Sequence, residues 1–175
     1  MDYYNALIAA KSHREIQVTP TSDGGLQTIS GDGQARIAEV KLYNSRGLET
    51  DELGVGELAT LSIQVEINQP LERLVCGFML KERFGQVVFG TNTWFAEQVL
   101  EDLKVAEPLS FDIQFEARLG VGSYSCTLAL TGGATHLEDN YHWVDLALVF
   151  KVINRDHVEF IGTNWLDPQF TIERG

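Results

Sequence analysis

Strict alternation of apolar and polar side chains is the feature of this sequence that most limits its fold. It is clearest in Leu61–Ile67 (LSIQVEI) and in Leu109–Glu116 (LSFDIQFE). A period of two places successive side chains on opposite faces of an extended strand, so each segment has one face toward a core and one toward water. The sequence therefore predicts sheets that are buried on one side and wet on the other.

Further strands are expected wherever this pattern recurs between turn-forming residues. Gly, Pro, Asn and Asp interrupt the chain at about the spacing of a β-sandwich. The segments are 35–43, 58–67, 73–81, 86–92, 109–116, 123–131 and 143–151, with a last strand within 158–173. Residues 94–104 (WFAEQVLEDLK) fit either a short helix or an irregular crossover. The fold class expected is all-β.

A tyrosine near the second cysteine indicates the type of sandwich. In Leu119–Cys126 (LGVGSYSC), Tyr124 enters a late strand two residues before Cys126. This arrangement resembles the tyrosine corner of immunoglobulin-like β-sandwiches. Cys76 is expected on a strand of the same sheet as Cys126, so a disulfide like that of antibodies is not expected. Without a secretory signal, both cysteines are expected to be reduced and buried.

The first part of the chain has a different character. The apolar residues of 2–15 fall at helical spacing, without Gly or Pro. Residues 16–34 are rich in Thr, Ser, Gly and Asp, which is typical of a linker. The expected organisation is an N-terminal helix and linker over 1–34, followed by a sandwich over 35–175.

The charge of the chain disfavours several classes of partner. It has 13 basic and 25 acidic residues, giving a net charge of −12 at pH 7. This charge repels nucleic acid and anionic membrane surfaces, and it suits a neutral ligand better. No apolar run approaches the roughly 20 residues that span a bilayer, so no direct membrane insertion is expected. No signal peptide is recognisable, and a cytoplasmic location is expected.

Four of the expected strands carry small or apolar residues on both faces. The residues expected to point inward are Cys76, Phe78, Leu80, Val87, Phe89, Tyr124, Cys126, Leu128, Leu130, Val144, Leu146, Leu148 and Phe150. Those expected to point outward are Val75, Gly77, Met79, Val88, Gly90, Asn92, Ser125, Thr127, Ala129, Thr131, Trp143, Asp145, Ala147 and Val149. One sheet should therefore present a second apolar surface, which usually meets a partner, a covering segment or a ligand.

This outer surface carries the side chains that carbohydrate binding requires. An aromatic ring stacks on the C–H face of a sugar, while amides, hydroxyls and carboxylates bond its hydroxyl groups. Over an expected floor of Gly77, Gly90, Ala129 and Ala147, the candidate binding residues are Asn92, Thr127, Trp143 and Asp145, with Trp94, Tyr141 and His142 as a rim. The alternative is that a dimer partner covers the face, with the two tryptophans in the interface core.

No motif in the sequence predicts catalysis. The phosphate-binding loop of ATPases and the Gly-x-Ser-x-Gly elbow of hydrolases are both missing, so no catalytic residue and no cofactor are expected. His136–His142 (HLEDNYH) fits no standard zinc spacing, and its acidic oxygens would suit calcium better; no metal is predicted. Adjacent carboxylates at 101–102 and 138–139 are typical of solvated loops, whereas glycoside hydrolysis needs two carboxyls facing a cleft.

Several segments taken together resemble a known family. They are Gly31–Ile37 (GDGQARI), Gly56–Glu57, Val75–Thr93 (VCGFMLKERFGQVVFGTNT) and Gly122–Leu128 (GSYSCTL). They resemble the C-terminal domain of the ATPase subunit (Wzt type) of O-antigen polysaccharide ABC exporters. The resemblance covers roughly residues 30–173, and its most specific part is the element Gly-x-x-Val-Phe-Gly-Thr-Asn-Thr.

The resemblance implies an immunoglobulin-like sandwich that binds the non-reducing end of a finished O-polysaccharide and selects it for export. It implies an ATPase domain before the sandwich, a membrane subunit as a further partner, and a cytoplasmic location at the inner membrane. It also implies a homodimer in which the C-terminal strand can be exchanged. It supplies no sugar-contacting residue, so the candidate site rests on the sequence pattern. The alternative function is a structural dimerisation domain that binds no glycan.

Overall fold

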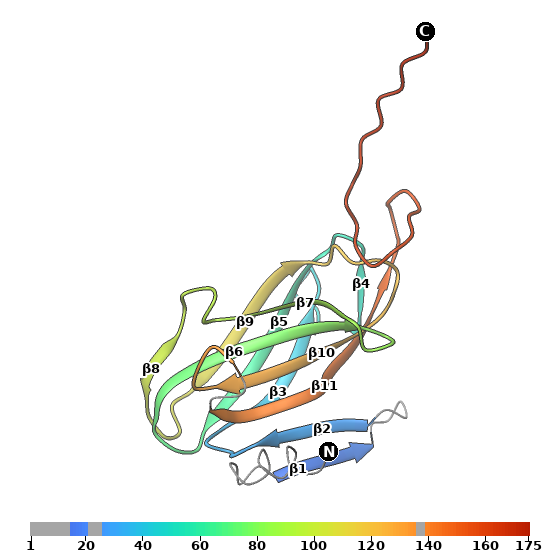
Figure 1. Cartoon of the computed structure of the whole chain (residues 1–175). Coiled ribbons are helices and arrows are strands. Elements are labelled where there is room, and N and C mark those ends of the chain that lie inside the picture. The colour runs from blue at the N-terminus through green and yellow to red at the C-terminus, as the bar shows by residue number, and fades with distance from the viewer. Residues whose placement is uncertain (1–14, 21–25, 136–138) are drawn as a thin grey trace, which may run out of the picture.

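The computed structural model describes residues 15–20, 26–135 and 139–175 of the chain. Within these ranges every regular element is a β-strand (Figure 1). The helix expected over 2–15 falls almost wholly outside them, and Glu15 belongs to a strand. No helix in the described ranges is long and apolar enough to cross a membrane.

Two sheets pack face to face in an immunoglobulin-like β-sandwich, which confirms the expected fold class. The larger sheet follows the order β1-β2-β11-β10-β6-β7, with β4 beside β11 and β8 beside β6; the smaller follows β3-β5-β9. Their bounds are β1 Glu15–Pro20, β2 Leu26–Gly31, β3 Ala35–Tyr43, β4 Glu52–Gly54, β5 Leu58–Ile67, β6 Leu71–Glu82, β7 Val87–Asn92, β8 Leu100–Leu103, β9 Leu109–Glu116, β10 Gly122–Thr131 and β11 Asn140–Ile153.

The alternating segments form β5 and β9, as predicted. Leu61 pairs with Ile113, and Ile63 pairs with Phe111, so both strands turn the same face toward the larger sheet. Leu61 and Ile63 are fully buried because β5 is the central strand of its sheet. The apolar residues of β9 are only half-buried, since β9 is an edge strand with solvent on its outer side.

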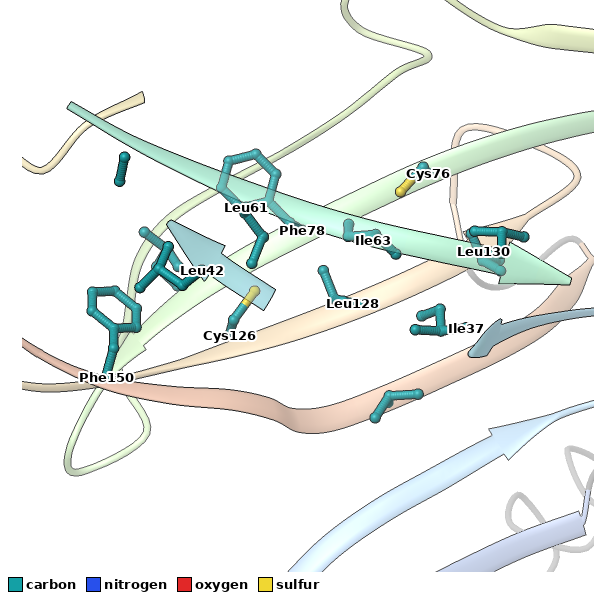
Figure 2. Packing of buried hydrophobic residues seen from close by; sticks show 14 of the residues in the cluster. Ile37, Leu42, Leu61, Ile63, Cys76, Phe78, Cys126, Leu128, Leu130 and Phe150 are labelled. Carbon is teal, nitrogen blue, oxygen red and sulfur yellow. The ribbon is translucent and has the colours of Figure 1, made fainter. Parts of the chain in front are cut away.

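The hydrophobic core fills the space between the two sheets (Figure 2). Phe78 of β6, Leu128 of β10 and Phe150 of β11 face Leu61 and Ile63 of β5 across this space. Burial of such side chains removes their apolar surface from water, which is the main favourable contribution to folding. The core therefore fixes which faces of β6, β10 and β11 are left on the outside.

The tyrosine corner predicted from the sequence is present. The Tyr124 hydroxyl donates to the Gly120 carbonyl at 2.8 Å, four residues upstream, and its ring stacks on Phe150 at 5.8 Å. Cys76 and Cys126 lie on the neighbouring strands β6 and β10, as expected, and pair with Leu130 and Leu80 rather than with each other. Neither thiol is in a disulfide, and burial raises their pKa values to about 12.

The prediction of a linker over 16–34 was wrong for the described residues in that range. β1 and β2 form an antiparallel hairpin, and β2 extends the larger sheet through the pairs Ser30–Trp143 and Ile29–Val144. Residues with high strand propensity, such as Val18, Thr28 and Ile29, outweigh the surrounding Gly and Ser. The ATPase domain expected before the sandwich stays a prediction.

The two segments at the ends of the predicted pattern also differ from expectation. Residues 94–104 form a turn followed by β8. Of the two alternatives expected for this segment, the irregular crossover is therefore confirmed and the short helix is not. No strand forms within 158–173. Instead, Asn164 makes a single bridge with Leu119, and the residues that follow extend away from the sandwich (Figure 1). An alternating segment without a neighbouring strand cannot form the ladder bonds that define a strand.

A β-bulge between Leu80 and Lys81 changes the faces of β7. Val87, expected inward, is half exposed on the outer face, while Val88, expected outward, packs against the core. Phe89 does lie opposite Leu80 on the inner side, but it is 52% exposed because β7 is an edge strand. A bulge adds one residue to one strand and thereby reverses the alternation that the sequence pattern predicts.

A second bulge lies in the middle of β11. The register with β10 shifts between Cys126 and Leu128, and Leu146 has a positive φ of 51°. Ala147, expected outward, packs against the core, while Leu146, expected inward, lies beside Asp145 on the outer face. These two assignments were therefore wrong, and the bulge is the physical reason.

Candidate functional site

A groove of about 510 Å³ crosses the outer face of the larger sheet, over β6, β7 and β10. Its floor consists of Gly77, Gly90 and Ala129, which lie on neighbouring strands: Gly77 is paired with Ala129, and Gly90 with Met79. Because nothing larger than a methyl group rises from these positions, a ligand can lie close to the backbone. The fourth expected floor residue, Ala147, is not in the groove because of the β11 bulge.

The walls of this outer groove are mostly apolar, with hydroxyl groups between them. The apolar lining residues beside the floor are Val75, Phe78, Met79, Val87, Phe95, Leu128, Ala134 and Trp143. The hydroxyl-bearing residues are Thr91, Thr127, Thr131 and Thr135. No Asp or Glu is among the described lining residues. The groove therefore offers apolar contact and neutral hydrogen bonding, without a net charge of its own.

Trp143 stands at one side of the groove and is half-buried. Its position on β11 is fixed from both sides, because it pairs with Ala129 of β10 and with Ser30 of β2. A tryptophan held between two strands presents a large ring at little entropic cost. This is the residue that the sequence pattern singled out for stacking, and the structure places it in the groove.

Thr127 and Asp145 form a short polar chain with Lys81. The buried Thr127 hydroxyl donates to Asp145 Oδ1 at 2.5 Å, and Lys81 Nζ donates to the same oxygen at 2.9 Å. Burial alone would raise the pKa of Asp145, but the bonds from Thr127 and Lys81 and the Lys81 charge outweigh it and lower the pKa. Asp145 is thus held ionised beside the groove, although it does not line it.

Asn92 joins two loops at one end of the groove. Its side-chain amide donates to the Ala134 carbonyl at 3.1 Å and accepts from the Phe95 amide at 2.9 Å. The sequence pattern favoured a ligand contact for Asn92. The structure shows that half of its bonding capacity already serves the protein, although the residue does line the groove.

The three expected rim residues do not line the groove. Trp94 lies under the guanidinium of Arg73, at 5.5 Å from its ring centre. Tyr141 is buried in the core and donates to the Arg73 carbonyl at 3.1 Å. His142 faces the other side of the sheet, where Nδ1 accepts the Ile37 amide at 3.0 Å.

A register shift in β11 explains the misplacement of Tyr141. The β10–β11 register shifts between Leu130 and Thr131, which makes Tyr141 an extra residue and turns it into the core. His142 pairs with the buried Leu130 in regular register and faces β3, because it neighbours the outward Trp143. Burial, helped by the Arg36 charge, lowers the pKa of His142. The expected strand began at Trp143, so the sequence analysis placed Tyr141 and His142 at its rim without assigning them a face.

The groove residues that the sequence analysis did not place on the outer face include Phe78, Thr91 and Leu128 on the strands, and also Val87, Phe95, Ala134 and Thr135. Val87 reaches the groove only because of the bulge in the β6–β7 pair. Phe95, Ala134 and Thr135 lie on loops, where no periodicity signals direction. Within the described ranges no three His, Cys, Asp or Glu residues are grouped to hold a metal ion; His136–Glu138 of the metal-like segment lie outside those ranges.

Comparison with known proteins agrees with this architecture. The sequence model of the family described as "Wzt C-terminal domain" matches residues 27–166, which is most of the chain. A solved structure, titled "Crystal structure of the C-terminal domain of wzt", superposes with a TM-score of 0.73 at 18% identity, covering 84% of this chain and 89% of that one. A search among curated proteins gives no match. The chain therefore belongs to the Wzt C-terminal domain family, a domain of the ATPase subunit of O-antigen exporters.

Proposed function

We propose that this chain binds the non-reducing end of an O-polysaccharide without catalysis, and that it thereby gives the exporter its substrate recognition. The observation that carries the proposal is the outer groove itself. It combines a floor of Gly77, Gly90 and Ala129 with the Trp143 ring and a set of threonine hydroxyls. These are the parts that a neutral sugar requires: space near the backbone, a stacking surface and hydrogen-bonding groups.

The charge distribution supports a neutral ligand. The net charge of the chain is −12, and the described lining of the groove holds no charged side chain. Binding should therefore depend only weakly on salt, because few ion pairs would form. For a flexible ligand in a shallow groove, we expect a dissociation constant between about 1 μM and about 1 mM.

The state of Asp145 supports a binding role rather than hydrolysis. A glycosidase needs a general acid whose pKa is raised, together with a second carboxyl about 5–10 Å away. The pKa of Asp145 is lowered instead, by Thr127 and Lys81 against the effect of burial. A carboxylate held ionised in this way cannot protonate a leaving group at neutral pH.

The wider partners follow from family membership and remain part of the proposal. In the complete subunit, an ATPase domain would precede the sandwich and would dock on the membrane subunit of the exporter. The bound chain end would thus be held in the cytoplasm close to the inner-membrane translocation path. Recognition is an equilibrium binding step in this scheme, and ATP hydrolysis belongs to the other domain.

Affinity electrophoresis through gels that contain the O-polysaccharide of the same cell tests the binding proposal. Gly90→Leu fills the groove without backbone strain, because a Cβ at residue 90 would meet Met79 only at 3.5 Å. Trp143→Ala removes the stacking ring. Trp94→Ala is the matched control, since Trp94 lies outside the groove. We expect retardation of the wild type and the control, and loss of retardation in the two groove variants.

Failure of the wild type to be retarded by that polysaccharide, or equal retardation of all four proteins, contradicts the proposal. Circular dichroism and size-exclusion chromatography check that each variant keeps its fold and oligomeric state. An unrelated charged polymer, such as heparin, serves as a second control in the gel, and we expect it to retard none of the proteins.

A second candidate function is a structural dimerisation domain, and the C-terminal segment favours it. Leu166, Phe170 and Ile172 are each more than 80% exposed, and they lie on a segment that extends away from the sandwich (Figure 1). Apolar residues at alternate positions need a sheet to pack on. We therefore propose a homodimer in which the two copies exchange this C-terminal segment. Such a dimer is compatible with glycan binding, and dimerisation would be the whole function of the domain if the groove binds no glycan.

A further inference from the structure

A second hollow of about 320 Å³ lies on the same outer face as the groove, near the hairpin between β6 and β7. We call it the serine hollow; its main lining residues are Lys81, Ser123, Ser125, Asp145, Leu146 and Val149. Ser125 pairs with Lys81 on one side and with Val149 on the other. These residues are therefore next to one another on the three central strands of the sheet.

The serine hollow and the outer groove are consecutive parts of one strip. Along β10 the outward residues run from Ser123 and Ser125, in the hollow, to Thr127, Ala129 and Thr131, in the groove. At about 3.3 Å per residue, the strip is about 26 Å long. The bonds from Thr127 and Lys81 to Asp145 mark the boundary between the two parts. The strip is thus longer than a single sugar ring and is divided into two.

The boundary depends on a strained piece of backbone. Leu146 has a φ of 51°, a conformation that residues other than glycine seldom adopt. Its carbonyl is held by the Gln27 side chain of β2, which donates at 3.1 Å. The strain leaves Leu146 and Asp145 both on the outer face. Strain of this kind persists where the surroundings enforce it, and it is concentrated at functional sites.

The two ends of the strip differ. At the groove end, the Asn92–Ala134 bond ties the turn after β7 to the loop after β10, and Phe95 and Thr135 line the groove there. No such bond between loops crosses the face beside the serine hollow among the described residues. A polymer whose end occupies the groove would therefore leave the protein over the serine hollow.

The chemistry of the serine hollow suits a neutral, hydroxyl-rich segment. The four charged residues that line it, Lys81, Glu82, Arg83 and Asp145, sum to no net charge, and Lys81 is paired with Asp145. Glu82 accepts the amides of Phe84 and Gln86, and the Arg83 guanidinium lies over the Phe84 ring. The hydroxyls of Ser123 and Ser125 make no hydrogen bond to other described residues. Next to them, Leu146 and Val149 provide an apolar patch for the C–H face of a ring.

From these observations we infer that the serine hollow is a second carbohydrate subsite, which binds the sugars that follow the chain end in the outer groove. The domain then reads a segment of the polymer rather than one terminal sugar. The inference rests on the proposed function, because it assumes that the end lies in the groove. In this inference the Leu146 bulge separates two subsites: the apolar outer groove, which binds the chain end, and the polar serine hollow, which binds the sugars that follow.

Isothermal titration calorimetry with non-reducing-end fragments of the O-polysaccharide from the same cell, sorted by length, tests this inference. For the wild type, affinity should rise by about tenfold, which is about 1.4 kcal/mol, once fragments are long enough to reach the hollow. Ser125→Phe fills the hollow and should abolish this gain while leaving the shortest binding fragment unaffected. Ser62→Phe, on the outer face of the smaller sheet, is the matched control and should keep the gain.

The outcomes separate the two proposals. If the wild type binds fragments but affinity does not rise with length, or if Ser125→Phe keeps the gain, the second subsite is refuted while groove binding stands. If the wild type binds no fragment, the proposed function itself fails. Should Ser125→Phe not fold, Ser123→Phe fills the same hollow from the end of β10 and is read in the same way.

Discussion

Glu57 joins three segments at the end of the sandwich that carries β4. Its carboxylate accepts the Gly54 amide at 2.7 Å, the Ser45 hydroxyl at 2.9 Å and the Arg155 guanidinium at 3.1 Å. Burial opposes ionisation, but the bonds from Gly54 and Ser45 and the charge of Arg155 prevail and lower the pKa. The side chain thus ties the loop before β4 to the segment after β11.

The lowered pKa of Glu57 predicts a pH-dependent contribution to stability. Because its folded pKa lies below the ordinary value of 4.5, the contribution is present above that value and is lost as pH falls through the folded pKa. Glu57→Gln should be less stable than the wild type at about pH 7, and the difference should shrink toward about pH 3. Urea unfolding across this range measures it. Glu66→Gln, an exposed residue with a 3.8 Å ion pair, is the control.

A constant difference between Glu57→Gln and the wild type at all pH values would contradict this account. So would an equal effect in the Glu66 variant, because an exposed ion pair contributes little. The two outcomes distinguish a partly buried, hydrogen-bonded carboxylate from general charge repulsion in an acidic protein.

At the scale of elements, the segment after β11 is seated on the sandwich by close backbone contact. The Gly120 amide donates to the Thr163 carbonyl at 2.9 Å, and the Trp165 amide donates to the Arg118 carbonyl at 3.1 Å. The Trp165 ring lies against His157, with ring centres 4.1 Å apart. These contacts set the point from which the C-terminal segment leaves the molecule.

Replacement of Gly120 should break these backbone contacts between the segment after β11 and the sandwich. A Cβ at residue 120 would lie 1.8 Å from the Gly162 carbonyl oxygen, so one of the two segments must move. We expect Gly120→Ala to lower the free energy of unfolding by about 1–3 kcal/mol and to speed hydrogen exchange at the Trp165 amide. Gly122→Ala, whose Cβ would meet only Tyr124 at 3.9 Å, is the matched control. Unchanged hydrogen exchange at the Trp165 amide in Gly120→Ala would show that the Gly120 contacts do not hold this segment against the sandwich.

At the scale of the whole molecule, the exposed C-terminal segment predicts self-association. The apolar residues Leu166, Phe170 and Ile172 alternate with polar ones, so in an extended conformation they share one face. Truncation after Trp165 should convert a dimer into a monomer of nearly unchanged thermal stability, as measured by light scattering and calorimetry. The segment contributes nothing to the core of its own sandwich, which is why stability should persist.

A pair of double variants uses the alternation as its own control. Phe170→Asp with Ile172→Asp should produce the monomer, because both changes fall on the apolar face. Gln169→Asp with Thr171→Asp adds the same charge on the other face and should leave the dimer intact. Dimers in both variants, or a monomeric wild type, would show that this segment does not join two copies.

The sequence by itself determined the alternating strands β3, β5, β6, β7, β9, β10 and β11, and most of their buried faces. Leu61 and Ile63 of β5, and Cys126, Leu128 and Leu130 of β10, are buried as the period of two predicts, because burial of an apolar face is a local property of an alternating strand. It also determined the tyrosine corner and the small-residue floor at Gly77 and Gly90. These follow from residue type and spacing alone.

Only the tertiary structure decided where the alternation breaks. The bulges beside Leu80 and at Leu146, and the register shift before Tyr141, depend on how neighbouring strands align over many residues. One such shift moves a side chain to the opposite face, which is why Val87 lines the groove while Tyr141 is turned into the core. The outer groove and the serine hollow are products of those shifts, and no single strand carries the information that places them.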